Sequence, residues 1–424
     1  MPVASYKRGW IYLALGALLV PGIASIVLVL LRSLEIRVSE WQDIFKAALV
    51  IHVDLSIYAW MIITFILLTS LELKINRNLE KPVLYLCATG TILVAISPFF
   101  GKPQVTLSNY IPVLESGIFF AGIIIFALAS SFYFLFLVLK PKLSFGIRTA
   151  GILYVLAVFL VIHSIFLIDK SHNSYFEIIF WGGGHMLQLV ITMLMLLAWT
   201  IIIKDGYSGF ELSKGFLNFL YLIMLLAGLY ALYIHFSFNP NEPEYRIGMT
   251  RMMQWGGGIS AVLLAGYILL KTTKARLSKN KALNLLVFYA SLSLFVAGGL
   301  IGLLISGSNT IVPAHYHGSI VAVTIALMGL IYYYLPRLGY AKVQGKLALS
   351  QPLIYALGQL MHIAGLVIIG GAGAARKLAG NTQVAGSEFG IMLVRFGGLI
   401  AVIGGILFIV VVVLAMKKPA LDAK

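Results

Sequence analysis

The 424-residue chain has a single cysteine and few charged residues. Cys87 lies in an apolar run, and one thiol alone excludes an internal disulfide. Only 11% of the residues are charged, with 15 Asp and Glu against 31 Lys and Arg. No Cys-x-x-Cys-His sequence and no Cys/Met copper motif of a soluble domain is present. The sequence therefore has no c-type haem domain or cupredoxin domain of its own.

Apolar residues make up 60% of the chain, and its mean hydropathy is +0.98. Runs long enough to cross a bilayer recur throughout, which predicts an all-α, polytopic membrane protein. The connections are short, so a single transmembrane catalytic domain is expected over residues 1–424. Lys7 and Arg8 precede the first run without a small-residue cleavage pattern, which favours a first membrane helix over a removed signal peptide. Twelve spans are expected, roughly 10–31, 45–70, 82–99, 110–139, 146–169, 176–204, 215–237, 247–271, 283–306, 311–336, 350–370 and 387–416.

The cations gather in every second connection. This asymmetry predicts that both termini are cytoplasmic, in a prokaryotic cytoplasmic membrane. It also accounts for the net charge of +16 without a nucleic-acid partner. The cations expected inside are Lys74, Arg77, Lys81, Lys140, Lys142, Arg148, Lys204, Lys214, Lys271, Lys274, Arg276, Lys279, Lys281, Arg337, Lys342, Lys346, Lys417, Lys418 and Lys424.

The segment Pro313-Ala314-His315-Tyr316-His317-Gly318 opens the tenth span. Histidines at i and i+2 of a helix point roughly 200° apart, so His315 and His317 are suited to two different metal centres rather than one. An ionisable residue in a membrane helix is a functional candidate. The alternative is a pair of packed interfacial histidines.

Five of the eight histidines are expected at the same depth, in the outer part of the membrane, on four different helices. Unrelated packing histidines have no reason to share a depth. The remaining three are expected in ordinary roles: His172 solvated in an outer loop, and His163 and His362 as hydrogen-bonded packing residues. The five are His52, His185, His235, His315 and His317.

With these histidines on the second, sixth, seventh and tenth spans, the chain resembles subunit I of the haem-copper oxidase superfamily. That superfamily includes the cytochrome c oxidases, the cbb3-type oxidases and the nitric oxide reductases. The resemblance covers nearly the whole chain, because twelve helices form the family core. Its motifs are His52, Trp181-Gly182-Gly183-Gly184-His185, His235, Trp255-Gly256-Gly257, His315-Tyr316-His317-Gly318 and Tyr332-Tyr333-Tyr334-Leu335-Pro336.

The resemblance implies the cofactors and their ligands. His52 and His317 would bind a low-spin haem, and His315 would be the proximal ligand of a high-spin haem. His185 and His235 would hold a second metal, copper or non-haem iron. Cations near the outer ends of the last two spans would pair with haem propionates, or else are ordinary interfacial cations: Arg376, Lys377 and Arg395.

The second metal is where the chain departs from the family pattern. The family places two histidines together on the seventh helix, whereas Phe236 follows His235 here. Two imidazoles make a poor site for copper or iron. Either Gln188, Tyr233 or Asn239 supplements the site, or the metal is absent.

The tyrosine that oxygen-reducing members attach to a metal-binding histidine is also missing from its usual positions. Leu189 occupies one such position, and Tyr230 lies about one residue, roughly 100° of helix rotation, from the other. Tyr230 is therefore a candidate catalytic residue, with packing as its alternative.

The inner halves of the spans lack the acids and lysines of proton-pumping members. Asp54 and Glu115 are expected to be buried, but near the outer face. This pattern resembles nitric oxide reductases, which draw protons from outside and do not pump. A thin hydroxyl path through Thr192, Tyr221 and Tyr267 is the alternative.

The sequence thus favours a respiratory oxidoreductase that reduces nitric oxide or oxygen at a high-spin haem and second-metal centre. A nonpumping, nitric-oxide-reductase-like enzyme is favoured over a divergent cbb3-like oxidase. Electrons would come from a separate c-type cytochrome or cupredoxin subunit on the outer face. A haem relic that transfers electrons or senses a gas without turnover is the further alternative, and a transporter without haem is the third.

Overall fold

The computed structural model describes residues 5–33, 39–73, 75–273, 275–277, 282–376 and 387–419. In this part of the chain, twelve helical spans are long and apolar enough to cross a membrane. The expected all-α fold with twelve transmembrane helices is therefore confirmed, and the chain is a multi-pass membrane protein. Of the cations named above, Lys74, Lys274, Lys279, Lys281, Lys377 and Lys424 lie outside the described residues.

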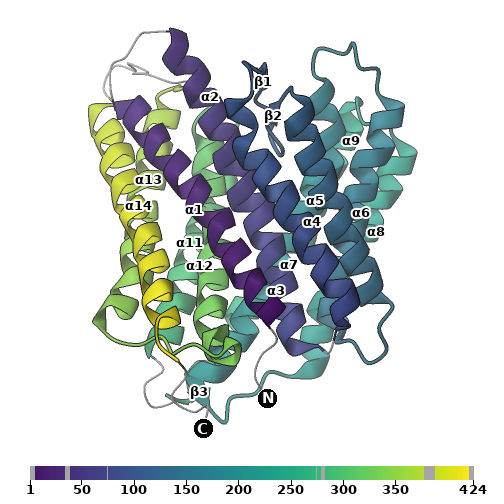
Figure 1. Ribbon diagram of the computed structural model, residues 1–424. Coiled ribbons are helices and arrows are strands. Elements are labelled where there is room, and N and C mark those ends of the chain that lie inside the picture. Colours follow the sequence, from purple (N-terminus) through teal and green to yellow (C-terminus); the bar gives the residue numbers. More distant parts are fainter. Residues whose placement is uncertain are drawn as a thin grey trace. The chain divides into compact units, whose positions relative to one another are not determined.

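The chain divides into two compact units. The first contains residues 1–71, 201–208 and 277–424, and the second contains residues 72–200 and 209–276. Figure 1 labels helices and strands of both units and colours them by position in the sequence. The two units are described separately below.

The first unit is built from the N-terminal and C-terminal helices. α13 and α14 pack along each other, as do α11 and α12 (Figure 1). Its elements are α1 (Ser5–Ser33), α2 (Ser39–Val53), the π-helix η1 (Asp54–Ala59), α3 (Trp60–Glu72), β3 (Tyr207–Ser208), α11 (Ala282–Gly302), α12 (Ile311–Tyr334), the 3₁₀-helix η4 (Leu335–Leu338), α13 (Lys346–Gly371) and α14 (Glu388–Met416).

The second unit contains the central helices, of which α4 and α5 lie side by side (Figure 1). β1 and β2 form a small antiparallel ribbon in the loop before α5, with Val105 opposite Leu114. The elements are α4 (Arg77–Ile96), the 3₁₀-helix η2 (Ser97–Phe99), β1 (Val105–Thr106), β2 (Val113–Leu114), α5 (Gly117–Val138), α6 (Phe145–Leu167), α7 (Tyr175–Gly206, up to residue 200), α8 (Lys214–Ser237), α9 (Pro243–Met252), the π-helix η3 (Met253–Gly258), α10 (Ile259–Thr272) and the start of β4 (Arg276–Leu277).

Local sequence signals explain where several helices begin and end. Ser116 and Ser213 cap α5 and α8, because each hydroxyl accepts a hydrogen bond from the backbone N–H three residues later. Asn76 caps α4 through Asn78 N in the same manner. After α12, Gly339 takes a φ of 84°, the left-handed conformation that ends η4.

The two ends of the chain meet in the first unit. Arg8, near the start of α1, donates to the carbonyl of Leu338 at 3.0 Å. The segment after Leu338 contacts the end of α14, because Ala341 N donates to Lys418 O at 3.0 Å. The start of α1 and the end of α14 therefore lie at the same end of this unit (Figure 1).

The pair α11 and α12 approach each other at two glycines. Gly298 and Gly318 face each other, and a Cβ on either residue would overlap the backbone of the other. Small residues permit such close contact between membrane helices. This contact fixes α12 next to α11 just beyond His315 and His317.

The spans that carry the haem-type histidines are also the most buried. Within an apolar stretch of 18 residues, the share of buried residues is 72% in Trp41–Glu72, 83% in Tyr175–Gly206 and 78% in Ile311–Leu338, against 50% or less in the other nine described spans. The interior spans thus hold His52, His185, His315 and His317, while His235 lies on the buried face of the more exposed α8.

Candidate functional site

Three histidines of the first unit, His52, His315 and His317, share one hydrogen-bonding pattern, which His362 also shows. In each ring, Nδ1 lies close to a backbone carbonyl oxygen, which only accepts, so Nδ1 carries the proton. The lone pair is then on Nε2, and this arrangement is usual for metal-bound histidine. These residues fit the haem ligands that the sequence predicts. The carbonyl partners are Pro21 for His52 at 3.0 Å, Gly298 for His315 at 2.8 Å and Pro313 for His317 at 2.8 Å.

The two histidines of α12 contact different neighbours, as their spacing predicts. His315 bonds to α11 through Gly298, whereas the His317 ring lies 5.0 Å from the ring of His362 on α13. His362 is only 8% exposed, and its Nδ1 is 2.9 Å from the carbonyl oxygen of Val394 on α14. Sequence reasoning treated His362 as a packing residue and missed that it packs against a predicted haem ligand.

The predicted propionate partners differ in their surroundings. Arg395 Nε, on α14, is buried and has no hydrogen-bond partner among the described residues. Arg376 Nε donates instead to Ser308 Oγ at 2.9 Å, in an exposed position. Lys377 lies outside the described residues. The Nε–H of Arg395 could therefore donate to a propionate, whereas the Nε–H of Arg376 already donates to Ser308.

Asp54 starts the π-helix η1 two residues after His52. Its side chain is 2% exposed, and neither carboxyl oxygen has a hydrogen-bond partner among the described residues. π-bulges often occur at functional sites, and a buried acid in a membrane span is a functional candidate. The expected burial of Asp54 is confirmed.

In the second unit, His185 is held by two neighbours. Its Nδ1 donates to the carbonyl oxygen of Trp181 at 2.9 Å, so Nε2 must accept from the hydroxyl of Tyr110, also at 2.9 Å. The loop that carries Tyr110 is anchored to α7, because both the backbone N–H and the side-chain amide of Asn109 donate to Glu177. Both ring nitrogens of His185 are thus engaged.

His235 belongs to a different hydrogen-bonded chain. Its Nε2 lies 2.8 Å from Nδ1 of His163 on α6, and its Nδ1 lies 3.0 Å from the hydroxyl of Tyr245 on α9. His235 is 2% exposed. His163, which the sequence predicts as a packing residue, is therefore the direct partner of a predicted metal ligand. One signal would have found it, since His163 lies near the outer end of its span, at the depth of the other five histidines.

The three glycines before His185 allow three side chains from other elements to pack directly against the α7 backbone. A Cβ at Gly182 would overlap the Tyr245 hydroxyl, one at Gly183 would overlap Val161, and one at Gly184 would overlap the Tyr110 ring. These glycines therefore permit Tyr245, Val161 and Tyr110 to pack closely against α7.

Two further candidates of the second unit, Tyr230 and Gln188, have partners outside these two clusters. Tyr230 is 39% exposed, and its ring packs 6.3 Å from that of Tyr233. Gln188 is half-buried, and its backbone carbonyl accepts from Thr192 Oγ1 at 2.9 Å.

The prediction that Glu115 is buried was wrong. Glu115 is exposed beside the β1–β2 ribbon and accepts a hydrogen bond from Thr106 Oγ1 at 2.6 Å. It lies outside the helix because α5 begins only at Gly117. Glu80 is the fully buried acid that the sequence missed. It was missed because α4 begins at Arg77, five residues before the expected start of that span.

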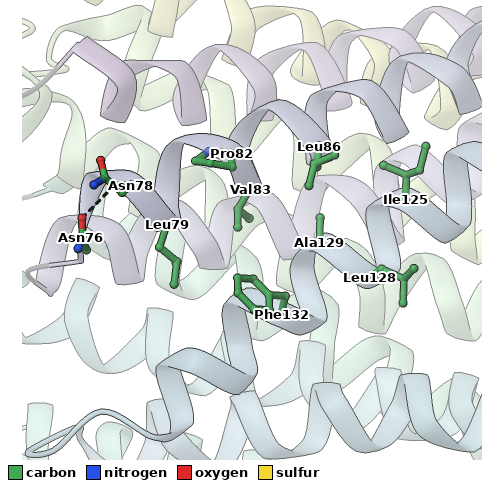
Figure 2. Close-up of a pocket in the computed structure, with 10 residues that line it drawn as sticks. All are labelled: Asn76, Asn78, Leu79, Pro82, Val83, Leu86, Ile125, Leu128, Ala129 and Phe132. Carbon is green, nitrogen blue, oxygen red and sulfur yellow. Dashed lines mark hydrogen bonds between the residues drawn. The ribbon is translucent and has the colours of Figure 1, made fainter.

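A groove of about 580 Å³ runs between α4 and α5 (Figure 2). Leu79, Leu86, Leu128 and Phe132 line it, and Asn76 and Asn78 lie at its polar end. None of its lining residues is a histidine, an acid or a cation. The groove therefore has no group for redox or acid–base chemistry, and the candidate site is at the histidines.

The donor atoms of the second unit do not fit the predicted second metal. His185 and His235 use both ring nitrogens in separate clusters. Among the described residues, no group of three or more His, Cys, Asp or Glu side chains is placed to hold a metal ion. Copper and iron sites in proteins use more protein ligands than two imidazoles. The first unit fits haem, and the second unit does not fit a second metal.

Comparison with known proteins supports the fold. The chain is 29% identical to an uncharacterized protein of Rickettsia prowazekii, over 96% of this chain and 94% of that protein. It is 30% identical to an uncharacterized protein of Aquifex aeolicus, over 71% of this chain and 77% of that protein. No protein-family model matches the chain. A solved structure of a heme-copper terminal oxidase dimer superposes with a TM-score of 0.80 and 18% identity, covering 99% of this chain and 86% of that one.

Proposed function

We propose that this chain, which belongs to the same family as the Aquifex aeolicus protein and has the fold of a heme-copper terminal oxidase subunit, is a haem-containing oxidoreductase. It moves electrons through a low-spin haem to a small gas, nitric oxide or oxygen, bound at a second haem. The observation that carries the proposal is the shared Nδ1-to-carbonyl hydrogen bond of His52, His315 and His317. The fold, taken alone, would not support it, because folds host unrelated functions.

The roles of the ligands follow from their positions. His52 and His317, which come from two helices, would hold a low-spin haem. His315 would hold a second, high-spin haem. When bound, haem iron supplies one-electron transfer and, on a face without a protein ligand, a position for the gas.

The chain orients these ligands. The carbonyls of Pro21, Gly298 and Pro313 each accept a hydrogen bond from one ring and so fix its orientation. The contact of Gly298 with Gly318 holds α12 against α11. Arg395 would donate its unpaired Nε to a haem propionate, a charge-assisted hydrogen bond.

Nitric oxide is the preferred gas in this proposal, because Tyr230 is exposed and packs against Tyr233, while the nitrogens of His235 face His163 and Tyr245. The alternative is a divergent cbb3-like oxidase that reduces oxygen to water. The test is gas consumption by the purified holoprotein with a reduced artificial donor, measured with nitric oxide and oxygen electrodes. Nitric oxide consumption that is lost in His315→Ala is expected, and oxygen consumption alone would support the alternative.

A second candidate function has a specific observation in its favour. The hydrogen bonds that engage both nitrogens of His185 and of His235 favour a haem protein that transfers electrons or binds a gas without turnover. His235→Ala separates the two candidates. Loss of turnover with both haems retained supports catalysis, whereas an unchanged protein without turnover supports the second candidate.

The proposal includes partners and location. The electron donor would be a c-type cytochrome or cupredoxin subunit at the outer face, since the chain has no such domain. The location would be a prokaryotic cytoplasmic membrane with both termini inside. Residues 1–424 would act as one transmembrane catalytic domain.

A further inference from the structure

The two histidines that the sequence assigns to a second metal are held in two separate clusters of the second unit. One cluster is Tyr110–His185–Trp181, and the other is His163–His235–Tyr245. Each cluster draws on helices or loops far apart in the sequence. They are therefore built by the fold and are not accidents of neighbouring residues.

The proton positions in the first cluster leave no lone pair for a metal. The Trp181 carbonyl can only accept, so Nδ1 of His185 carries the proton, and Nε2 accepts from the phenol of Tyr110. A metal at Nε2 would have to displace Tyr110. That side chain is fixed by Asn109, which binds Glu177 with two hydrogen bonds, and by the contact of its ring with Gly184.

The second cluster is closed in a similar way. Nε2 of His235 faces Nδ1 of His163 at 2.8 Å, and Nδ1 of His235 faces the Tyr245 hydroxyl. The Tyr245 hydroxyl itself sits against Gly182, where any side chain would expel it. A metal that took either nitrogen of His235 would leave half-buried His163 or buried Tyr245 without its hydrogen bond, which is unfavourable.

A third ligand is lacking as well. Phe236 stands where the family pattern has a second histidine, and its ring packs 5.6 Å from the rings of both His163 and His235. His163 thus pairs with His235 next to an apolar side chain. Among the described residues, neither cluster is part of a group of three or more His, Cys, Asp or Glu side chains that could hold a metal ion.

We propose that this chain binds no second metal, and that the Tyr110–His185 and His163–His235–Tyr245 hydrogen bonds take up the nitrogens that such a metal would need. The proposal rests on the proposed function only in treating haem iron as the chain's metal. A gas bound at the His315 haem then meets one metal ion instead of two. The polar side chains of the two clusters serve to position helices α6 to α9 rather than to bind a metal.

The test is a metal inventory of the purified holoprotein, from cells supplied with copper, zinc, iron and a haem precursor. Haem is counted by pyridine haemochrome, and total iron, copper and zinc by mass spectrometry. The expected result is iron equal to haem, with copper and zinc at background, also after incubation with added copper or zinc and desalting. One equivalent of copper, zinc or non-haem iron per chain that disappears in His235→Ala would overturn the proposal.

Electron paramagnetic resonance supplies a readout that needs no variant. A high-spin ferric haem without a neighbouring paramagnetic metal gives its uncoupled signal, and this signal is expected in the oxidised protein. A high-spin haem that binds carbon monoxide when reduced, yet lacks that signal when oxidised, would contradict the proposal. Failure of the proposed function is distinguishable, because it would appear as an absence of haem, whatever the count of non-haem metal.

A variant of the clusters provides the complementary test. Tyr110→Phe removes the donor to His185 Nε2 and keeps the ring that packs against Gly184. The expected result is an unchanged metal inventory with a lower unfolding temperature. Loss of a bound non-haem metal in Tyr110→Phe, with the haem count retained, would show that the first cluster serves a metal and would refute the proposal.

Discussion

The backbone of the first unit sets the proton position of three imidazoles. His52, His315 and His317 all direct Nδ1 at a carbonyl oxygen, which leaves Nε2 as the basic nitrogen. The sequence predicts these three residues, because spacing and depth are visible in it. Their carbonyl partners Pro21 and Gly298 are not predictable, because they lie 31 and 17 residues away on other helices.

At this scale, replacement of His317 is the first prediction. His317→Ala removes one of the two proposed ligands of the low-spin haem, so the haem content should fall from two to one per chain. The remaining haem should still bind carbon monoxide, because His315 is intact. Pyridine haemochrome and optical difference spectra measure both quantities. His172→Ala, in an exposed loop, is the control and should retain two haems. An unchanged haem count in His317→Ala would refute the ligand assignment.

Arg395 gives the second prediction. A hydrogen bond to a charged group contributes about 1.5–3 kcal/mol, and tenfold in an equilibrium constant is about 1.4 kcal/mol. Arg395→Gln should therefore increase haem loss to apomyoglobin about tenfold or more. It should also lower the haem midpoint potential, because the positive charge of Arg395 stabilises the reduced haem relative to the oxidised haem. Arg376→Gln is the matched control, because the Nε of Arg376 already donates to Ser308. Equal effects of both variants would argue against a propionate contact at Arg395.

Among the elements, α12 meets α11 at a close contact between two glycines. Gly318 faces Gly298 on α11 and leaves no room for a Cβ, whereas the neighbouring Gly299 has nothing within 4 Å of the place where a Cβ would lie. The three glycines differ in role although they look alike in the sequence. Only the packing of the two helices distinguishes them.

This difference gives the third prediction. Gly318→Ala should force α11 and α12 apart at a cost of about 1–3 kcal/mol, the usual range for overpacking. It should also reduce haem retention, because His315 and His317 precede the contact on α12. Gly299→Ala adds the same methyl group in open space and should be neutral. Thermal unfolding in detergent and haem content report the effect, and equal behaviour of the two variants would contradict the contact.

The two π-helices show what the sequence does not reveal about its elements. Residues 45–70 and 247–271 are each predicted as one continuous span, yet η1 and η3 interrupt them at residues 54–59 and 253–258. A π-helix depends on a local shift of backbone pairing that packing stabilises, and hydrophobic periodicity does not encode it. The start of α4 was misplaced because Glu80, an acid, lies inside the helix.

For the whole molecule, the twelve spans were predictable because bilayer thickness sets a length that hydropathy reveals. The partners of His185 and His235 were not predictable. Tyr110 lies 75 residues from His185, and His163 lies 72 residues from His235. No local motif links such pairs, so only the fold brings them together.

Orientation in the membrane gives the fourth prediction. Cys87 is fully buried, so a membrane-impermeant maleimide should leave the unmodified protein unlabelled. Lys142 and Asn173 are exposed in the loops at the two ends of α6. If the cation pattern sets orientation, Asn173→Cys should be labelled in intact cells and Lys142→Cys only in inverted vesicles. The opposite labelling pattern would refute cytoplasmic termini.

The central claim is that this fold holds two haems at His52, His315 and His317. The most direct measurement is a pyridine-haemochrome assay combined with a carbon monoxide difference spectrum on the purified, haem-supplied protein. Two haems per chain are predicted, one of which binds carbon monoxide. No haem in a folded preparation would contradict the account and leave only the fold.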